Sequence, residues 1–296
     1  MNFGKCSMPN IMISWRVFQR ERFPMRTHLP LIFVLLFAHI TLTGFSEVKA
    51  WPTIALFFVL LSFFFRMRLF DEIKDYETDC EMNPSRPLPR GILRVRDLKW
   101  TIFILFGFEL ALTCIANPIA LVLLLTAQGY SFLMYKEFFI GKFLRLHLTT
   151  YAVTHTVVMI LLSALCSTWL SEYLPWQLET RYWIFAIGCF GVFNVFEFGR
   201  KTFAETEEKS GADSYSKVWG RGGAVALNLS QVLLGLGAMG YAYPYNSLQW
   251  LLGGIILATL FITGINYLIS NTATAAKIYR AVSGVTILLI FCVGIL

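Results

Sequence analysis

Residues 51–79 read WPTIALFFVLLSFFFRMRLF followed directly by DEIKDYETD. The first part is an apolar run of about 20 residues, the length that an α-helix needs to cross the hydrocarbon core of a bilayer. The second part places acidic side chains at positions 71, 72, 75, 77 and 79. An apolar helix that ends in a dense acidic cluster indicates a membrane span with a polar site at its end.

The rest of the chain repeats the apolar pattern. Of its 296 residues, 56% are hydrophobic and 15% are charged, against roughly 45 to 50% and about 25% in globular proteins. This balance excludes a cytosolic enzyme, a nucleic-acid binder and a disordered protein. We predict an all-α, polytopic membrane protein of a single domain, residues 1–296, with about nine transmembrane helices. They lie near 29–46, 51–70, 98–116, 118–135, 149–170, 182–197, 219–242, 248–270 and 276–296.

Basic residues indicate the orientation of these spans. All but two of the 25 Lys and Arg residues fall in the N-terminal segment or near the loops that follow spans 2, 4, 6 and 8, and the exceptions are Lys49 and Arg181. The positive-inside rule therefore places the N-terminus and these loops in the cytoplasm and the C-terminus on the opposite side. Within the cytoplasmic segment 1–27, Ile11, Trp15 and Phe18 share one helical face, which suggests a short interfacial helix.

The acidic run has a pattern of its own. If the helix continues past residue 70, Glu72, Asp75 and Asp79 fall within about 60° of one another, and Arg68 lies on the same face. Like charges on one stripe repel, so the stripe needs a compensating cation or an aqueous cavity, and a hard divalent cation with oxygen ligands meets that need. The alternative is a solvated charged loop with pairs four residues apart, such as Asp71 with Asp75, offset by Lys74.

The next stretch is stiff and basic. Residues 83–91 read NPSRPLPRG, and their prolines exclude helix and hold Arg86 and Arg90 beside the acidic stripe. Carboxylates that bind a metal, next to arginines that fork onto phosphate oxygens, suit a metal diphosphate.

Residues 71–91 resemble the first signature of the UbiA superfamily of membrane-embedded prenyltransferases, NDxxDxxxD followed by a segment like NRPxRPxxxG. Asp replaces the Asn and Glu72 replaces the first Asp. The resemblance implies helices around a central cavity that opens to the cytoplasm. It also implies that Glu72, Asp75 and Asp79 hold Mg²⁺ on a prenyl diphosphate, and that Arg86 helps to fix the rigid loop and the diphosphate. Arg68, on the same helical face as these acids, is a further candidate for substrate binding.

Two further elements are similar to parts of that family. Tyr130 and Lys136 match a Tyr and a basic residue that contacts diphosphate, although Lys136 also suits a lysine that extends toward the membrane surface. The second signature, DxxDxxxD, falls on Asn194, Glu197 and Lys201, so the chain departs from it at every position. Either the second metal is held more weakly, or Lys201 meets the diphosphate directly. Further ligands are available from Glu205, Glu207 and Glu208, which equally suit a solvated loop.

The resemblance implies transfer of a prenyl group from its diphosphate to an aromatic or other lipophilic acceptor within the bilayer, with Mg²⁺ as cofactor and no nucleic acid as partner. One alternative is a membrane terpene cyclase of the same fold. Another, of a different class, is a cation transporter or permease, although transporter sites tend to lie at the membrane midplane. Glu109, inside the third span, is either functional or paired with a neighbouring helix.

Overall fold

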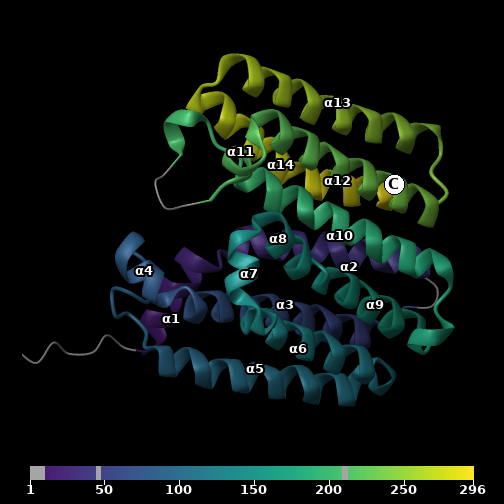
Figure 1. The fold of residues 1–296 in the computed structure, drawn as a ribbon. Helices are drawn as coiled ribbons and strands as arrows, with labels where there is room; N and C mark the ends of the chain where they lie inside the picture. Colours follow the sequence, from purple (N-terminus) through teal and green to yellow (C-terminus); the bar gives the residue numbers. More distant parts are fainter. Residues whose placement is uncertain (1–10, 45–47, 209–212) are drawn as a thin grey trace, which may run out of the picture. The chain divides into compact units, whose positions relative to one another are not determined.

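The computed structural model describes residues 11–44, 48–208 and 213–296 (Figure 1). Residues 1–10 of the predicted cytoplasmic segment therefore lie outside the described part. The described chain is helical throughout and contains no strand. Its α-helices are α1 (Ile11–Arg22), α2 (Met25–Thr43), α3 (Ala50–Lys74), α4 (Tyr76–Met82), α5 (Val95–Ala116), α6 (Leu121–Tyr135), α7 (Gly141–Leu146), α8 (Leu148–Thr156), α9 (Val158–Ser171), α10 (Thr180–Arg200), α11 (Tyr215–Val218), α12 (Gly220–Ala242), α13 (Ser247–Ser270) and α14 (Ala273–Ile295).

The predicted number of spans is confirmed. Within the described ranges, nine helical stretches are long and apolar enough to cross a membrane. The fifth stretch consists of α8 and α9, which meet at Val157. Just before this junction, the hydroxyl groups of Thr154 and Thr156 donate to the carbonyls of Thr150 and Ala152 at 2.8 and 3.0 Å. Such bonds compete with the helical hydrogen bonds and favour a bend.

The chain divides into two compact units, Met1–Phe33 with Ile54–Ala116 (unit 1) and Val34–Thr53 with Asn117–Leu296 (unit 2). In unit 1, residues 11–22 of the predicted N-terminal segment form the helix α1. Its Trp15 and Phe18 rings contact the ring of Phe65 on α3, with centroid distances of 6.2 and 6.3 Å. Phe18 is buried and Ile11 is exposed, so the aromatic part of the predicted face docks α1 onto α3.

Glu109 of α5 has a partner on the neighbouring helix of unit 1. Its carboxylate accepts two hydrogen bonds of 3.0 Å from the guanidinium of Arg66 on α3 and a third of 3.0 Å from Ser62. Both charged side chains are fully buried. The guanidinium carbon lies 4.4 Å from the ring centroid of Phe63 and 3.9 Å from that of Phe106. The paired alternative for Glu109 is therefore confirmed.

Unit 2 is built around α10, which packs against α9, α12 and α14 (Figure 1). Glycine allows the closest approaches. A Cβ atom on Gly199 of α10 would lie 2.3 Å from the Cβ of Ser283 on α14, and one on Gly235 of α12 would lie 2.8 Å from Val192 of α10. These contacts fix the end of α10 that carries Asn194, Glu197 and Lys201.

Candidate functional site

The segment between α4 and α5 is a chain of turns, as its prolines predict. Backbone hydrogen bonds run from Arg86 N to Asn83 O, from Gly91 N to Leu88 O and from Ile92 N to Pro87 O, each 3.0 Å long. Gly91 has a φ of +73°, a conformation that glycine adopts without steric cost. Leu88 and Leu93 are buried and anchor the segment, so Arg86 extends from a well-defined backbone.

The predicted continuous helix through residues 72–79 is wrong at one residue. The helix α3 ends at Lys74, Asp75 has φ −89° and ψ 1°, and α4 begins at Tyr76. Glu72 and Asp79 are 2% and 3% exposed, whereas Asp75 is exposed. Backbone hydrogen bonds still run from Asp75 N to Asp71 O at 2.9 Å and from Asp79 N to Asp75 O at 2.8 Å, so the departure from helical geometry is confined to Asp75.

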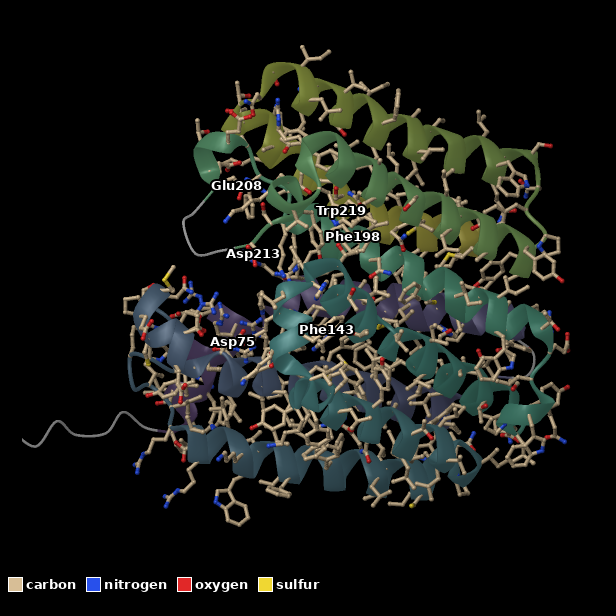
Figure 2. The ribbon with its side chains drawn as sticks, viewed as in Figure 1. Asp75, Phe143, Phe198, Glu208, Asp213 and Trp219 are labelled. Carbon is tan, nitrogen blue, oxygen red and sulfur yellow. The ribbon has the colours of Figure 1, made fainter. Side chains whose placement is uncertain are left out.

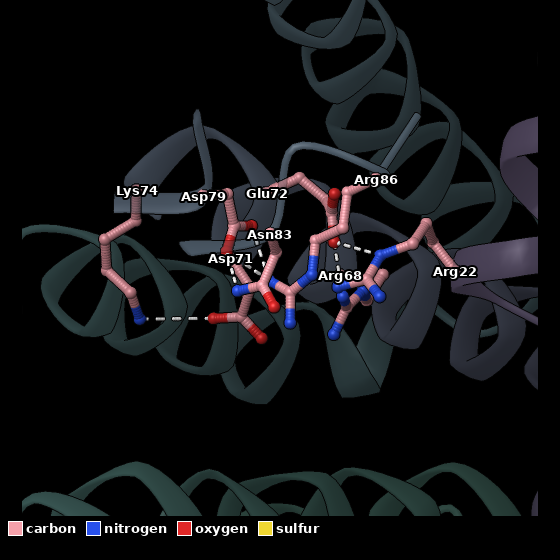
Figure 3. A network of polar contacts seen from close by, with 8 residues as sticks. All are labelled: Arg22, Arg68, Asp71, Glu72, Lys74, Asp79, Asn83 and Arg86. Carbon is pink, nitrogen blue, oxygen red and sulfur yellow. Dashed lines mark hydrogen bonds and ion pairs between the residues drawn. The ribbon is translucent and has the colours of Figure 1, made fainter. Parts of the chain in front are cut away.

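Glu72 is held by two arginines (Figure 3). Its Oε1 accepts a 2.7 Å hydrogen bond from Nε of Arg22 on α1 and forms a second ion pair with Arg68, one turn earlier on α3. The other oxygen, Oε2, is buried and has no hydrogen-bond partner among the described residues. A buried carboxylate oxygen without a donor is costly, and it is an available ligand for a cation.

Asp79 is held by residues 83–94 between α4 and α5, here called the turn segment (Figure 3). Both of its carboxylate oxygens accept from Nη1 of Arg86, the Oδ1 contact being 2.5 Å, and Nδ2 of Asn83 donates to Oδ1 at 3.0 Å. The predicted proximity of Arg86 to the acidic run is therefore confirmed. In this arrangement, the guanidinium of Arg86 occupies the oxygens that the sequence analysis assigned to a metal.

Asp75 differs from the two buried acids. No hydrogen bond to its side chain is present among the described residues. Partial desolvation of the carboxyl group raises the pKa of Asp75, and the attraction of Lys74 opposes this shift. The negative charges of Asp71 and Asp79 also raise the pKa, and Arg68 lowers it. Asp75 is therefore an exposed carboxylate between two buried acids of the same run.

The solvated-loop alternative applies to one residue of the run. Asp71 and Lys74 form a surface ion pair of 3.2 Å, one turn apart on α3 (Figure 3). The carboxylate side chain of Asp71 is 45% exposed, and such pairs contribute little to stability. Asp71 therefore behaves as a surface residue, in contrast to Glu72 and Asp79.

The oxygens of this cluster fit a hard divalent cation. Glu72 supplies the unpartnered Oε2 and Asp75 supplies a carboxylate without a hydrogen bond, and Mg²⁺ prefers one or two carboxylates together with phosphate oxygens. Among the described residues, no group of three or more His, Cys, Asp and Glu side chains is already arranged to hold a metal.

In unit 2, Asn194 is a fully buried link between helices. Its Oδ1 accepts a 2.6 Å hydrogen bond from Thr156 of α8, and its Nδ2 donates to Oε1 of Gln231 on α12 at 3.2 Å. Asn194 therefore joins three helices. Both of its polar atoms have partners, so this residue positions α10 in addition to any contact with substrate.

Glu197 follows Asn194 one turn later on α10, and Lys201 lies directly after the last residue of that helix. Lys201 Nζ lies 3.1 Å from Oε1 of Glu197, and Arg200 Nη2 lies 2.5 Å from Oε2. The Glu197 side chain is 17% exposed and that of Lys201 is 26% exposed. At the second signature, the carboxylate of Glu197 therefore contacts two cationic side chains, those of Arg200 and Lys201.

In unit 2, Tyr130 lies in α6 and Lys136 directly follows this helix. The hydroxyl of Tyr130 donates to the carbonyl of Thr154 on α8 at 2.6 Å. Lys136 is exposed, and its ammonium lies 5.1 Å from the ring centroid of Tyr135. Because α8 also bonds Asn194 through Thr156, this short helix connects Tyr130 with the second signature.

The acidic residues after α10 have partners in unit 2, and one of these acids, Glu208, is labelled in Figure 2. Arg280 of α14 forms two hydrogen bonds with Glu207, of 2.9 and 2.7 Å. These bonds hold the pKa of Glu207 below its ordinary value. Glu208 accepts from Ser214 and Ser216 at 2.6 and 2.7 Å, whereas Glu205 is exposed. Glu207 and Glu208 therefore have structural partners within the described residues.

Four partners of the acidic and amide side chains described above were not predicted from the sequence. Arg22 lies far from Glu72 in the chain, and Arg66 was not matched with Glu109. Thr156 and Gln231 were not recognised as the partners of Asn194. The only available signal was the presence of Arg66 inside an apolar span, where a charged residue requires a counter-ion.

Comparisons with known proteins agree with this architecture. A model of the UbiA prenyltransferase family matches residues 28–290. A solved structure from work on digeranylgeranylglyceryl phosphate synthase in membranes has a TM-score of 0.65 and 15% sequence identity, and the match covers 96% of this chain and 98% of that one. No curated protein sequence matches this chain significantly.

Two further solved structures are similar. An apo UbiA homologue from Aeropyrum pernix K1 has a TM-score of 0.62 and 16% identity, with coverage of 90% of this chain and 96% of that one. A UbiA homologue from Archaeoglobus fulgidus, bound to DMAPP and Mg²⁺, has a TM-score of 0.56 and 13% identity, with coverage of 91% and 98%. At these identities, the structural matches establish a common fold.

Proposed function

Because this integral, multi-pass membrane protein belongs to the UbiA prenyltransferase family, we propose that it transfers a prenyl group from a prenyl diphosphate to an aromatic or other lipophilic acceptor. The proposal rests mainly on the contact of carboxylates with arginines at residues 68–86 of unit 1. A prenyl diphosphate and Mg²⁺ are proposed by analogy with the Archaeoglobus fulgidus homologue, which binds DMAPP and Mg²⁺.

The arginines of unit 1 are assigned to the diphosphate. Arg68 and Arg86 are partly exposed, at 28% and 30% of their side chains, so each can exchange a carboxylate for a phosphate partner. Their planar guanidinium groups match phosphate oxygens. Donors aimed at the leaving group stabilise the negative charge that develops as the allylic carbon–oxygen bond breaks.

The carboxylates are assigned to the cation. Glu72 and Asp75 would hold Mg²⁺ through the oxygens described above, with Asp79 joining them once Arg86 has turned to the diphosphate. When bound, Mg²⁺ supplies Lewis-acid stabilisation of the departing diphosphate. This assignment explains why a buried oxygen of Glu72 is left without a hydrogen bond, which a purely structural ion pair does not require.

The residues of unit 2 are also assigned to diphosphate binding. Lys201 and Lys136 would provide positive charge, and Tyr130 would provide a hydroxyl group. Glu197 would be the remaining acid of the second signature, with Asn194 fixing the helix that carries it. The contact between Lys201 and Glu197 supports a substitution in which a lysine replaces part of the charge of a second metal.

We further propose that the N-terminus and both acidic loops face the cytoplasm and that the prenyl tail enters from the bilayer. The charge distribution supports this orientation. A lipid-like tail avoids exposure to water by entering sideways, while the diphosphate stays near the charged residues.

The test uses the full chain in proteoliposomes with Mg²⁺, a prenyl diphosphate and a panel of lipophilic acceptors. The proposal predicts acceptor-dependent release of diphosphate and a prenylated product in the mass spectrum. A cyclic hydrocarbon formed without acceptor would instead identify a terpene cyclase. Mg²⁺ uptake into the liposomes, with no product formed, would identify a cation permease.

A further inference from the structure

The first acid of the cluster is held by a helix that lies outside the family match. The match begins at residue 28, whereas α1 covers Ile11–Arg22. From the last residue of this helix, Arg22 donates through Nε to Oε1 of Glu72 at 2.7 Å (Figure 3). The Arg22 side chain is only 17% exposed and that of Glu72 is 1% exposed. This ion pair is therefore largely removed from solvent.

The helix α1 is docked firmly enough to set the position of Arg22. Phe18 is fully buried, and Phe23, just after the helix, contacts Phe65 of α3 with a centroid distance of 5.1 Å. At the same end of α1, Glu21 accepts a 2.7 Å hydrogen bond from Arg90 of the turn segment. Two independent attachments thus hold the end of α1 against α3 and residues 83–94.

The hydrogen bond from Arg22 involves only one of the two carboxylate oxygens of Glu72. Both Arg22 and Arg68 bind Oε1, and the buried Oε2 has no hydrogen-bond partner among the described residues. A glutamate has one more rotatable bond than an aspartate, so it needs external contacts to fix its carboxylate. Groups that bind a ligating carboxylate orient it toward the metal, and their removal typically costs about 10- to 100-fold in metal affinity.

We propose that Arg22 is a positioning residue, which holds Glu72 by Oε1 so that Oε2 is presented to the divalent cation of the diphosphate donor. This inference rests on the proposed function. It makes α1 a part of the functional site that precedes the region matched by the family. Arg22 acts through Glu72 and makes no contact of its own with the reacting atoms.

Positioning and simple electrostatics predict opposite results. Removing a positive charge close to a cation site lowers the repulsion and strengthens cation binding. Removing a group that orients a ligand weakens cation binding. The sign of the change in metal affinity therefore separates the two roles without reference to turnover.

The experiment measures Mn²⁺ binding to the full chain in nanodiscs at a fixed concentration of inorganic diphosphate, with free Mn²⁺ followed by electron paramagnetic resonance. We expect Arg22→Gln to weaken Mn²⁺ binding by about 10-fold or more. Arg22→Lys, which keeps a donor and a charge, should recover most of the affinity. Arg20→Gln removes an exposed arginine of the same helix and should leave the affinity unchanged.

Two further variants separate the possible failures. Glu21→Ala removes the hydrogen bond of α1 with Arg90 and leaves Glu72 untouched, so an equal loss in this variant would mean that α1 docking, and not Arg22, matters. Unchanged or tighter Mn²⁺ binding in Arg22→Gln, with weaker binding in Glu72→Gln, would overturn the role of Arg22 alone. Unchanged binding in Glu72→Gln would overturn both that role and the assignment of Glu72 to the metal.

Discussion

The guanidinium of Arg66 and the carboxylate of Glu109 face each other in a fully buried ion pair between α3 and α5. Two 3.0 Å hydrogen bonds join the groups, and both residues lie within membrane-spanning stretches. Neither side chain reaches solvent. An unpaired charge in these apolar surroundings would be strongly disfavoured, and each of the two side chains neutralises the charge of the other. The pair therefore fixes α3, the helix that leads to the acidic cluster, relative to α5.

Breaking this pair should strongly destabilise the protein. We expect Glu109→Ala to lower the free energy of unfolding by about 3 to 5 kcal/mol, because it leaves the Arg66 charge buried without a partner. The double variant Arg66→Leu with Glu109→Leu should recover most of the loss. Denaturant unfolding of the chain in detergent measures both values.

An exposed ion pair provides the matched control. Lys49 and Glu172 are 2.6 Å apart, with side chains that are 65% and 47% exposed. Glu172→Ala should change stability by no more than about 1 kcal/mol. Equal losses in Glu109→Ala and Glu172→Ala would contradict the importance that we assign to burial.

Asp75 should be essential for turnover, whereas Asp71 should not. Asp75→Ala removes an available carboxylate next to Glu72 and Asp79, and we expect the rate of diphosphate release to fall by at least about 100-fold. Asp71→Asn removes a surface partner of Lys74 and should keep most of the activity. Release of diphosphate, with the amount of folded protein checked by size-exclusion chromatography, compares the two. Unchanged turnover in Asp75→Ala would remove the site assignment.

The ion pair of Glu207 with Arg280 should contribute a stability that depends on pH. The pKa of Glu207 in the folded chain lies below its ordinary value, chiefly because Arg280 hydrogen-bonds to the carboxylate. The folded state therefore gains stability above the ordinary pKa of a glutamate and loses it as the pH falls through the lowered pKa. Thermal unfolding midpoints measured from pH 7 to pH 3 should fall less steeply in Glu207→Gln. Parallel curves for the two proteins would exclude this contribution.

Gly199 should tolerate no side chain. A Cβ atom there would lie 2.3 Å from the Cβ of Ser283, so Gly199→Ala forces α10 and α14 apart and should cost about 1 to 3 kcal/mol. Gly237 of α12 has no atom within 4 Å of the same position, so Gly237→Ala should be neutral. The thermal unfolding midpoints of both variants in detergent test this contrast. Equal midpoints for Gly199→Ala and Gly237→Ala would mean that α10 and α14 are not closely packed at Gly199.

The sequence was sufficient to predict the helices and the composition of the first cluster. Apolar length determines each span, and the prolines of residues 83–91 exclude helix, as the turns confirm. The prediction failed at Asp75, because a break of one residue depends on tertiary contacts rather than on helical spacing. It also could not show that Arg86 binds Asp79, since the spacing of charges does not determine which rotamers pair them.

Contacts between distant parts of the chain were beyond prediction. Arg22 has no periodic relation to Glu72, and its contact depends on aromatic packing of α1 against Phe65. In the second signature, the departure from DxxDxxxD was visible in the sequence, but the polar partners of Asn194 were not. That polar network requires α8, α10 and α12 to be assembled.

The central proposal is that Glu72 and Asp75 hold the divalent cation of a metal diphosphate at the end of α3. A crystal structure of the chain, grown in a lipid phase with Mn²⁺ and inorganic diphosphate, tests it most directly, because anomalous scattering locates the metal. We predict that Mn²⁺ binds Oε2 of Glu72 and the carboxylate of Asp75. Mn²⁺ bound elsewhere, with neither carboxylate among its ligands, would contradict the proposal.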